Sequence, residues 1–252
     1  MTPRFSVWLA ALALAATAAK AVAAATPALL QLPPAARVGV VNLLDPEVTH
    51  LHAARRLEER FLRTYAVSWP VSDMLLAAVG AHLAQLGLTA VPVGPSEGLR
   101  RGREACFLDA ALGRKLPREC LPLYADLAAA QRLDALIVLG PGRNDATHAG
   151  AQRHRELPDY LRGWCVVTGE GSAQAPLLLD LTELLLIATR PAGVELVARA
   201  WGGELRQSWT GFRAPQDLHS LPPPQLDELQ SLFAAMLGQQ AQALLTHLQQ
   251  AR

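Results

Sequence analysis

Lysine is almost absent from this chain of 252 residues, because Lys20 and Lys115 are the only lysines among its 23 basic residues. Together with the abundance of alanine, leucine and proline, this bias is typical of a GC-rich genome, so an arginine by itself says little about phosphate binding. The formal net charge is only +1. Attraction to nucleic acid or to an anionic membrane surface needs a basic excess, and the composition therefore argues against both partners.

Several motifs with known chemistry are also missing. The chain has no C-x-x-C, which argues against a thioredoxin-like dithiol and against a zinc knuckle. It has no G-K-[ST], and Gly140-Pro141-Gly142 lacks the third glycine and the following helix of a dinucleotide fingerprint. We therefore expect no nucleotide and no other cofactor.

The amino terminus has the layout of a secretory signal peptide over residues 1–25. Arg4 precedes an apolar run from Phe5 to Ala19, and small residues in A-x-A arrangement follow as far as Ala25. The run is short for a membrane span, although an uncleaved anchor is the alternative. No cysteine follows the candidate cleavage sites, so lipid attachment there is chemically excluded. We expect a mature chain in the periplasm, with no transmembrane segment after cleavage.

The three cysteines are interpreted in the light of this export. Disulfides form in oxidising compartments, and Cys106 and Cys120 flank one short polar segment. Closing so short a loop contributes about 3 kcal/mol in the chain-entropy model. We predict a Cys106–Cys120 disulfide, and a buried free thiol at Cys165 in the apolar stretch WCVVTG.

The periodicity of apolar residues predicts a tether over residues 26–36 and a single domain over residues 37–252. Its fold class is α/β (α+β), a three-layer mixed sheet with parallel strands and helices in the first half, and an antiparallel β-meander and a long closing helix in the second. Segments 57–67 and 177–188 fit either strand or helix. The expected strands are 37–44, 47–53, 88–93, 134–140, 164–169, 177–189 and 194–201, and the expected helices are 72–86 with Ser72 as N-cap, 97–111, 122–131 and 222–250.

Four segments carry a resemblance to a known group. RVGVVNLL forms the first strand, LTAVPV follows the first clear helix, DALIVLG forms the third strand of this order, and LLLDLTELLLIATRPAGVELVARAW reads as a hairpin. In this order they resemble the periplasmic α/β domains of the curli-secretion lipoprotein CsgG and of the TolB amino-terminal type. The likeness is one of pattern over most of the mature chain, so it implies a fold and no functional residues. The lipidation cysteine of the lipoprotein members is missing, which argues against outer-membrane anchoring.

Ser96 lies in Gly94-Pro95-Ser96-Glu97-Gly98, a formal match to the G-x-S-x-G turn of serine hydrolases. In such enzymes the turn exposes a serine hydroxyl to a histidine base. However, Pro95 removes a backbone donor beside the serine, and no HG-type oxyanion loop precedes the turn. We interpret it as an ordinary loop and keep an exported serine hydrolase as the alternative function.

Two further groups of polar residues are candidate sites. His50 and His52 share one face of a predicted strand, a spacing able to chelate Zn²⁺ or Cu²⁺, although a solvated strand face explains them without a metal, which we favour. Ligands of open α/β sheets gather beyond the carboxyl ends of the strands. The candidate ligand-binding residues at these ends are Asn42, Asp45 and Glu47 after one strand, and Arg143, Asn144, Asp145 and His148 after another.

Taken together, these observations favour an exported, non-enzymatic accessory or interaction protein of the bacterial cell envelope. We expect no catalytic residue, no metal, and another envelope protein as the partner.

The signal peptide generates the first testable prediction. Amino-terminal sequencing of the protein recovered from the periplasm is expected to find the first residue between Ala24 and Thr26, because the A-x-A sites end there. A mature chain that begins at Met1 or Thr2 would contradict cleavage.

Overall fold

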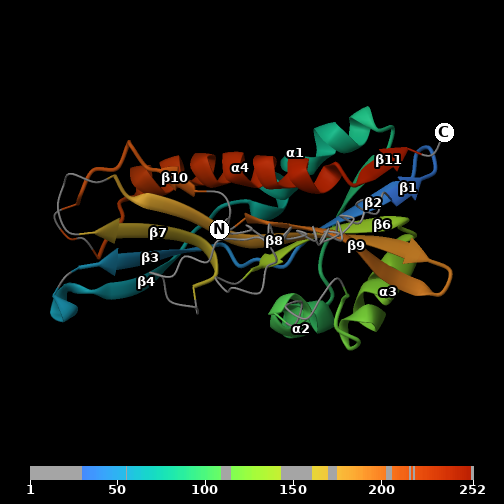
Figure 1. The fold of residues 1–252 in the computed structure, drawn as a ribbon, viewed down its shortest axis with the longest axis horizontal. Coiled ribbons are helices and arrows are strands. Elements are labelled where there is room, and N and C mark those ends of the chain that lie inside the picture. Colours follow the sequence, from blue (N-terminus) through green and yellow to red (C-terminus); the bar gives the residue numbers. More distant parts are fainter. Residues whose placement is uncertain are drawn as a thin grey trace, which may run out of the picture.

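The computed structural model describes residues 30–54, 56–108, 115–142, 161–169, 175–202, 206–215, 217 and 219–250. The predicted signal peptide lies outside these residues. Within them the chain forms a nine-stranded mixed sheet, a two-stranded sheet and four helices (Figure 1). The strands are β1 (Leu30–Leu32), β2 (Arg37–Asn42), β3 (Glu47–Ala53), β4 (Phe61–Ala66), β5 (Thr89–Val93), β6 (Ala135–Pro141), β7 (Gly163–Gly169), β8 (Leu177–Arg190), β9 (Gly193–Trp201), β10 (Arg206–Ser208) and β11 (Leu248–Gln250).

Strand β8 connects the two halves of the large sheet. Along one edge, its first residues pair with β7 and its later residues pair with β6, both antiparallel. Along the other edge, its first residues pair with β10 and its later residues pair with β9, again both antiparallel. Strand β2 then adds to β6, and β3 adds to β7, in parallel. The outermost strands are β5 beside β2 and β4 beside β3.

Helices cover both faces of this sheet, which confirms the three-layer α/β architecture. Helices α1 (Val71–Gln85) and α4 (Pro223–Leu245) lie side by side on one face, and α2 (Glu97–Leu108) and α3 (Cys120–Gln131) lie on the other (Figure 1). Each face has its own apolar core. Phe233 and Leu75 belong to the first core, and Phe107 and Tyr124 to the second.

The two ambiguous segments are resolved by their surroundings. Residues 177–188 are strand β8, and every residue from Leu178 to Ala188 is buried. A strand that is buried on both faces needs no alternation of apolar and polar residues. The leucine run therefore showed no periodicity that distinguishes a strand from a helix. In the other segment a single 3-10 turn, Leu57–Glu59, precedes β4.

Several expected boundaries were wrong. Residues 26–36 were expected to form a tether, but Leu30 and Leu32 are buried in β1, which pairs in parallel with β11. The closing helix, expected over 222–250, ends at Leu245, because the residues after it form that pairing. Helix α1 begins at Val71 after Pro70, and Ser72 is not its cap.

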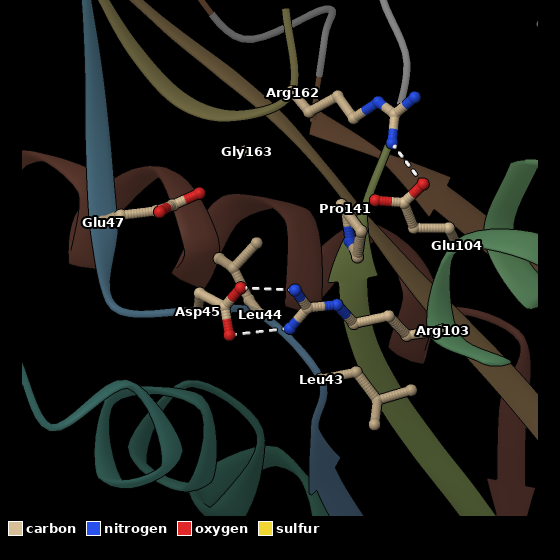
Figure 2. Close-up of a pocket in the computed structure, with 9 residues that line it drawn as sticks. All are labelled: Leu43, Leu44, Asp45, Glu47, Arg103, Glu104, Pro141, Arg162 and Gly163. Carbon is tan, nitrogen blue, oxygen red and sulfur yellow. Dashed lines mark hydrogen bonds and ion pairs between the residues drawn. The ribbon is translucent and has the colours of Figure 1, made fainter. Parts of the chain in front are cut away.

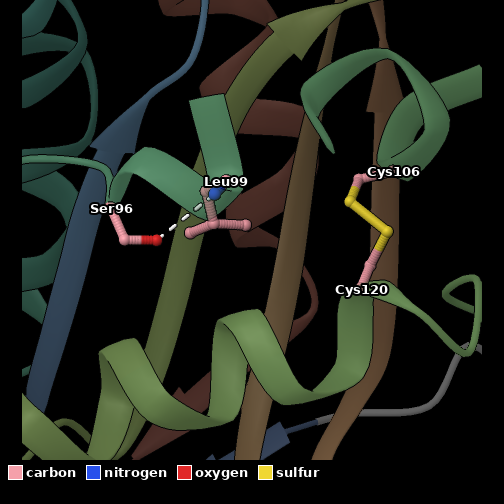
Figure 3. Close-up of a disulfide and its surroundings, with 4 residues drawn as sticks. All are labelled: Ser96, Leu99, Cys106 and Cys120. Carbon is pink, nitrogen blue, oxygen red and sulfur yellow. Dashed lines mark hydrogen bonds between the residues drawn. A yellow bond between two sulfur atoms is a disulfide. The ribbon is translucent and has the colours of Figure 1, made fainter. Parts of the chain in front are cut away.

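The cysteine prediction is confirmed. Cys106 and Cys120 are joined by a disulfide, with their α-carbons 5.7 Å apart (Figure 3). The bond connects the last turn of α2 to the first residue of α3, and both cysteines are buried. Cys165 is a buried free thiol on β7. Burial raises the pKa of this thiol, and the neighbouring Asp180 carboxylate raises it further, so Cys165 is held in its unreactive protonated form.

A buried polar cluster on β8 faces α4. Asp180 is fully buried, and its Oδ1 accepts hydrogen bonds from the Thr182 backbone N–H (3.0 Å) and hydroxyl (2.7 Å). Gln240 of α4 donates to the carbonyls of Thr182 (3.1 Å) and Ala200 (2.8 Å), which ties the helix to β8 and β9. A Cβ on Gly202 would lie 2.6 Å from Asp180 Cγ, so only glycine fits beside the carboxylate.

The opposite face of β8 carries a buried ion pair. Glu183 Oε1 lies 2.9 Å from Arg199 Nε of the adjacent strand β9, and Arg199 Nη2 donates to Oε2 at 3.2 Å. Burial lowers the pKa of Arg199, and the Glu183 carboxylate opposes this change. Removing one partner of such a pair leaves an uncompensated buried charge, which is strongly destabilising.

Asp180 generates a prediction about the pH dependence of stability. Burial raises its pKa from 3.8 to about 6, so the folded chain binds this proton more tightly than the unfolded chain. Stability is therefore lost as the pH rises from about 4 through about 6. In Asp180→Asn this loss is absent, and the free energy of unfolding, relative to wild type, is expected to rise by about 3 kcal/mol between pH 3 and pH 7.5.

Urea denaturation at a series of pH values measures this difference. Asp73→Asn, on the exposed first turn of α1, is the matched control, because it also removes one carboxylate but no buried group. A difference between Asp180→Asn and wild type that stays constant with pH would contradict the assignment.

Candidate functional site

The candidate site lies where two pairs of strands meet along one edge of β8. Strands β2 and β6 end there, and β3 and β7 begin, because Pro141 pairs with Thr182 and Gly163 pairs with Leu181. A pocket of about 80 Å³ opens at this break in the sheet (Figure 2). We call it the junction pocket, and its lining residues are Leu43, Leu44, Asp45, Glu47, Arg103, Glu104, Pro141, Arg162 and Gly163.

Two ion pairs form the charged part of the pocket wall. The Arg103 guanidinium on α2 binds both carboxylate oxygens of Asp45, with contacts of 2.6 and 2.5 Å (Figure 2). This hydrogen bonding raises the pKa of Arg103. Arg162 binds Glu104 at 3.1 Å. All four side chains remain partly exposed, so they are accessible to a binding partner.

A third carboxylate leaves the pocket with one negative charge in excess. Glu47, at the start of β3, makes no side-chain ion pair or hydrogen bond with any other described residue. Its side chain points toward the space between Asp45 and Arg162 (Figure 2). The site therefore presents two arginines and three carboxylates drawn from three separate segments of the chain.

The structure places three of the seven strand-end candidates. Asp45 and Glu47 line the junction pocket. Asn42 instead holds the turn after β2, because its side chain donates to the Leu44 carbonyl (3.2 Å) and accepts from the Leu44 N–H (2.9 Å). The other four candidates, Arg143, Asn144, Asp145 and His148, lie outside the described residues.

Sequence reasoning missed three charged residues of the pocket. Arg103 and Glu104 belong to the helical stretch RRGREA, which reads as an ordinary solvated helix face, and Arg162 precedes a strand. Only their spatial arrangement distinguishes them. Arg100 and Arg101 stand on the same helix and do not line the pocket.

Ser96 acts as a helix cap in the structure. Its hydroxyl accepts a hydrogen bond from the Leu99 backbone N–H at 3.3 Å, at the start of α2 (Figure 3). An oxygen at this position satisfies one of the unpaired N–H groups of the first helical turn. Among the described histidines, none forms a hydrogen bond with Ser96. The G-x-S-x-G match is therefore explained as a strand-to-helix turn with a serine cap.

The pair His50 and His52 does share one strand face, but the expectation that this face is solvated was wrong, because both side chains are buried. His50 Nε2 and His52 Nδ1 each lie 2.8 Å from the Thr168 hydroxyl oxygen on the adjacent strand. The ring of Phe61 packs against both imidazoles. No group of three or more His, Cys, Asp or Glu suited to a metal ion occurs among the described residues.

The hydrogen-bond roles in this cluster follow from one carbonyl. The Tyr65 hydroxyl donates to the His219 carbonyl at 2.9 Å, so its oxygen accepts from His50 Nδ1–H at 3.4 Å. The neutral His50 then accepts at Nε2 from the Thr168 hydroxyl, and the Thr168 oxygen accepts from His52 Nδ1–H. Burial, and next the neighbouring His52, lower the pKa of His50 to about 4, which keeps this chain intact at neutral pH.

Comparisons with known proteins add little to this description. No protein-family model and no curated protein matches the chain. Among solved structures, the chain is similar to the hypothetical protein CT253 from Chlamydia trachomatis, with 10% sequence identity and a TM-score of 0.36. The match covers 84% of this chain and 95% of that chain. At this TM-score the likeness carries no argument about function.

In the described part of the chain, none of the helices is both long enough and apolar enough to span a bilayer.

The histidine chain predicts fixed tautomers. At pH 7, ¹⁵N NMR is expected to find both His50 and His52 protonated at Nδ1, because Tyr65 and Thr168 accept these protons. Thr168→Val removes the bridging hydroxyl and is expected to release this preference in His52. His82 on α1, which is outside this hydrogen-bonded chain, serves as the internal control. An Nε2–H signal from His50 at pH 7 would contradict the proposed direction of the chain.

Proposed function

We propose that this chain is an exported, non-enzymatic interaction protein of the bacterial cell envelope, and that it binds another envelope protein through the junction pocket. The observation that carries the proposal is the convergence, from three segments, of partly exposed arginines and carboxylates in one pocket. Paired arginine and carboxylate groups are the usual means of recognising a charged surface with defined geometry.

The chemistry of the pocket supports recognition rather than catalysis. Arginine keeps its proton at all physiological pH values, and the bidentate contact with Asp45 stabilises that state further. Arg103 is therefore suited to binding and poorly suited to moving a proton. The exposed ion pairs also exchange partners at small cost, since such a pair contributes only about 0–1 kcal/mol to stability.

The disulfide supports export. A buried Cys106–Cys120 bond is typical of proteins that fold in an oxidising compartment. Together with the signal-like amino terminus, it supports a periplasmic location. Membership of the CsgG and TolB type of periplasmic α/β domain belongs to the same proposal, and the order of strands and helices along the first half supports it.

Site-specific photocrosslinking in envelope preparations tests the proposal. A crosslinking amino acid at Glu47, inside the pocket, is expected to capture a partner, whereas the same amino acid at the exposed Glu195 of β9 is not. Arg103→Ala is expected to lower the yield from Glu47 by roughly tenfold, the equivalent of one lost charge-assisted hydrogen bond.

Arg101→Ala is the matched control, because Arg101 stands on the same helix and pairs with Glu97 outside the pocket. Neither substitution removes a buried group, so both variants are expected to fold. Equal capture from Glu47 and Glu195, or a yield from Glu47 that Arg103→Ala leaves unchanged, would contradict a partner site at the junction pocket.

A further inference from the structure

Helix α2 supplies two of the charged residues of the junction pocket, yet it is weakly attached to the rest of the molecule. Among its side chains whose burial is described, only Leu99, Cys106 and Phe107 are buried. Phe107 lies against the backbone of β6, where a Cβ on Gly140 would meet its ring at 2.3 Å. The remaining described side chains of the helix are exposed or half-buried.

The face of α2 that meets α3 offers little packing of its own. Gly98, Gly102 and Cys106 follow one another at four-residue steps and therefore share one face of the helix. On α3, Leu123 lies against both glycines, 2.9 Å from a Cβ placed on Gly98 and 3.6 Å from one placed on Gly102. Glycine also weakens a helix relative to alanine. At Gly98 the Leu123 side chain already fills the space, whereas at Gly102 the interface lacks a side chain that would fit and stabilise it.

The disulfide occupies the third position of the same face. Cys106 is bonded to Cys120, the first residue of α3. Arg103 lies three residues before Cys106, and Glu104 lies two residues before it. The bond therefore fixes the turn of the helix that carries both pocket residues (Figures 2 and 3). Arg103 then reaches Asp45 across the break in the sheet, and Glu104 reaches Arg162.

We infer that the Cys106–Cys120 disulfide is the positioning element of the junction pocket, because it replaces the missing packing between α2 and α3 and holds Arg103 and Glu104 in place. Its importance for binding depends on the proposed function, whereas its effect on α2 does not. The consequence is that a folded sheet can exist without an assembled pocket when the bond is absent.

Hydrogen exchange of the full chain tests this inference. In Cys106→Ser/Cys120→Ser, the amides of α2 are expected to exchange at least about tenfold faster, while those of β6 and β8 keep their protection. Arg103 binds Asp45 through Nη1 and Nη2, so its side-chain Nη–H signals are expected to lose their slow exchange. The Nη2–H signal of Arg199, which donates to Glu183, is expected to keep it. Cys165→Ala, which removes a buried thiol outside the disulfide, is the matched control.

A rescue separates positioning from general stability. In the disulfide-free background, Gly102→Ala adds a methyl that meets Leu123 at 3.6 Å, an ordinary contact. It is expected to slow exchange in α2 by about fivefold, since alanine favours helix over glycine. The same change leaves β6 and β8 untouched.

Reduction of the wild-type protein provides a second arm that does not depend on a variant folding. A dithiol reductant supplies two electrons and two protons, the S–S bond breaks to two thiols, and the reductant becomes a disulfide. Selective loss of α2 protection in both arms supports the inference. Unchanged protection in α2, or equal loss in α2 and the central strands, overturns it. Neither result depends on whether a partner binds at Glu47.

Discussion

Burial of strand β8 on both faces is the constraint on which the rest of the structure depends. Both halves of the sheet are joined through it, because β7 and β10 flank its first residues and β6 and β9 flank the later ones. Helices lie on both faces of the sheet, and every side chain of β8 from Leu178 to Ala188 is buried. Each polar group on this strand must therefore find its partner inside the protein.

These polar groups stand where β8 changes partners. Thr182 pairs with the last residue of β6, and Asp180 and Glu183 lie on either side of it, on opposite faces. Thr182 donates to Asp180, Gln240 of α4 donates to the Thr182 carbonyl, and Arg199 of β9 donates to Glu183. The junction pocket lies beside these residues, at the point where β6 ends and β7 begins along the edge of β8. The change of pairing partner along β8 thus has two consequences. One is the pocket with its charged residues at the surface, and the other is the polar cluster in the core.

Local motifs were poor guides to chemistry here, for a physical reason. Ser96 and the histidines at positions 50 and 52 match patterns of hydrolases and of metal sites, but each side chain is occupied by a neighbour that the motif does not contain. Thr168 is more than a hundred residues away from the histidines along the chain. By contrast, the rule that ligands gather at strand ends needs only the order of the strands, and two of the residues that it selected, Asp45 and Glu47, line the junction pocket.

The sequence by itself determined the class of fold, most of the helices and strands, and the pairing of Cys106 with Cys120, because these depend on local periodicity and on short separations along the chain. Only the tertiary structure decided that the leucine run of β8 is a strand, that Leu30 pairs with Leu248, and that Arg103 reaches Asp45. Such contacts join segments far apart in the sequence. They are set by which surfaces are buried together, and a pattern read along one segment does not contain that information.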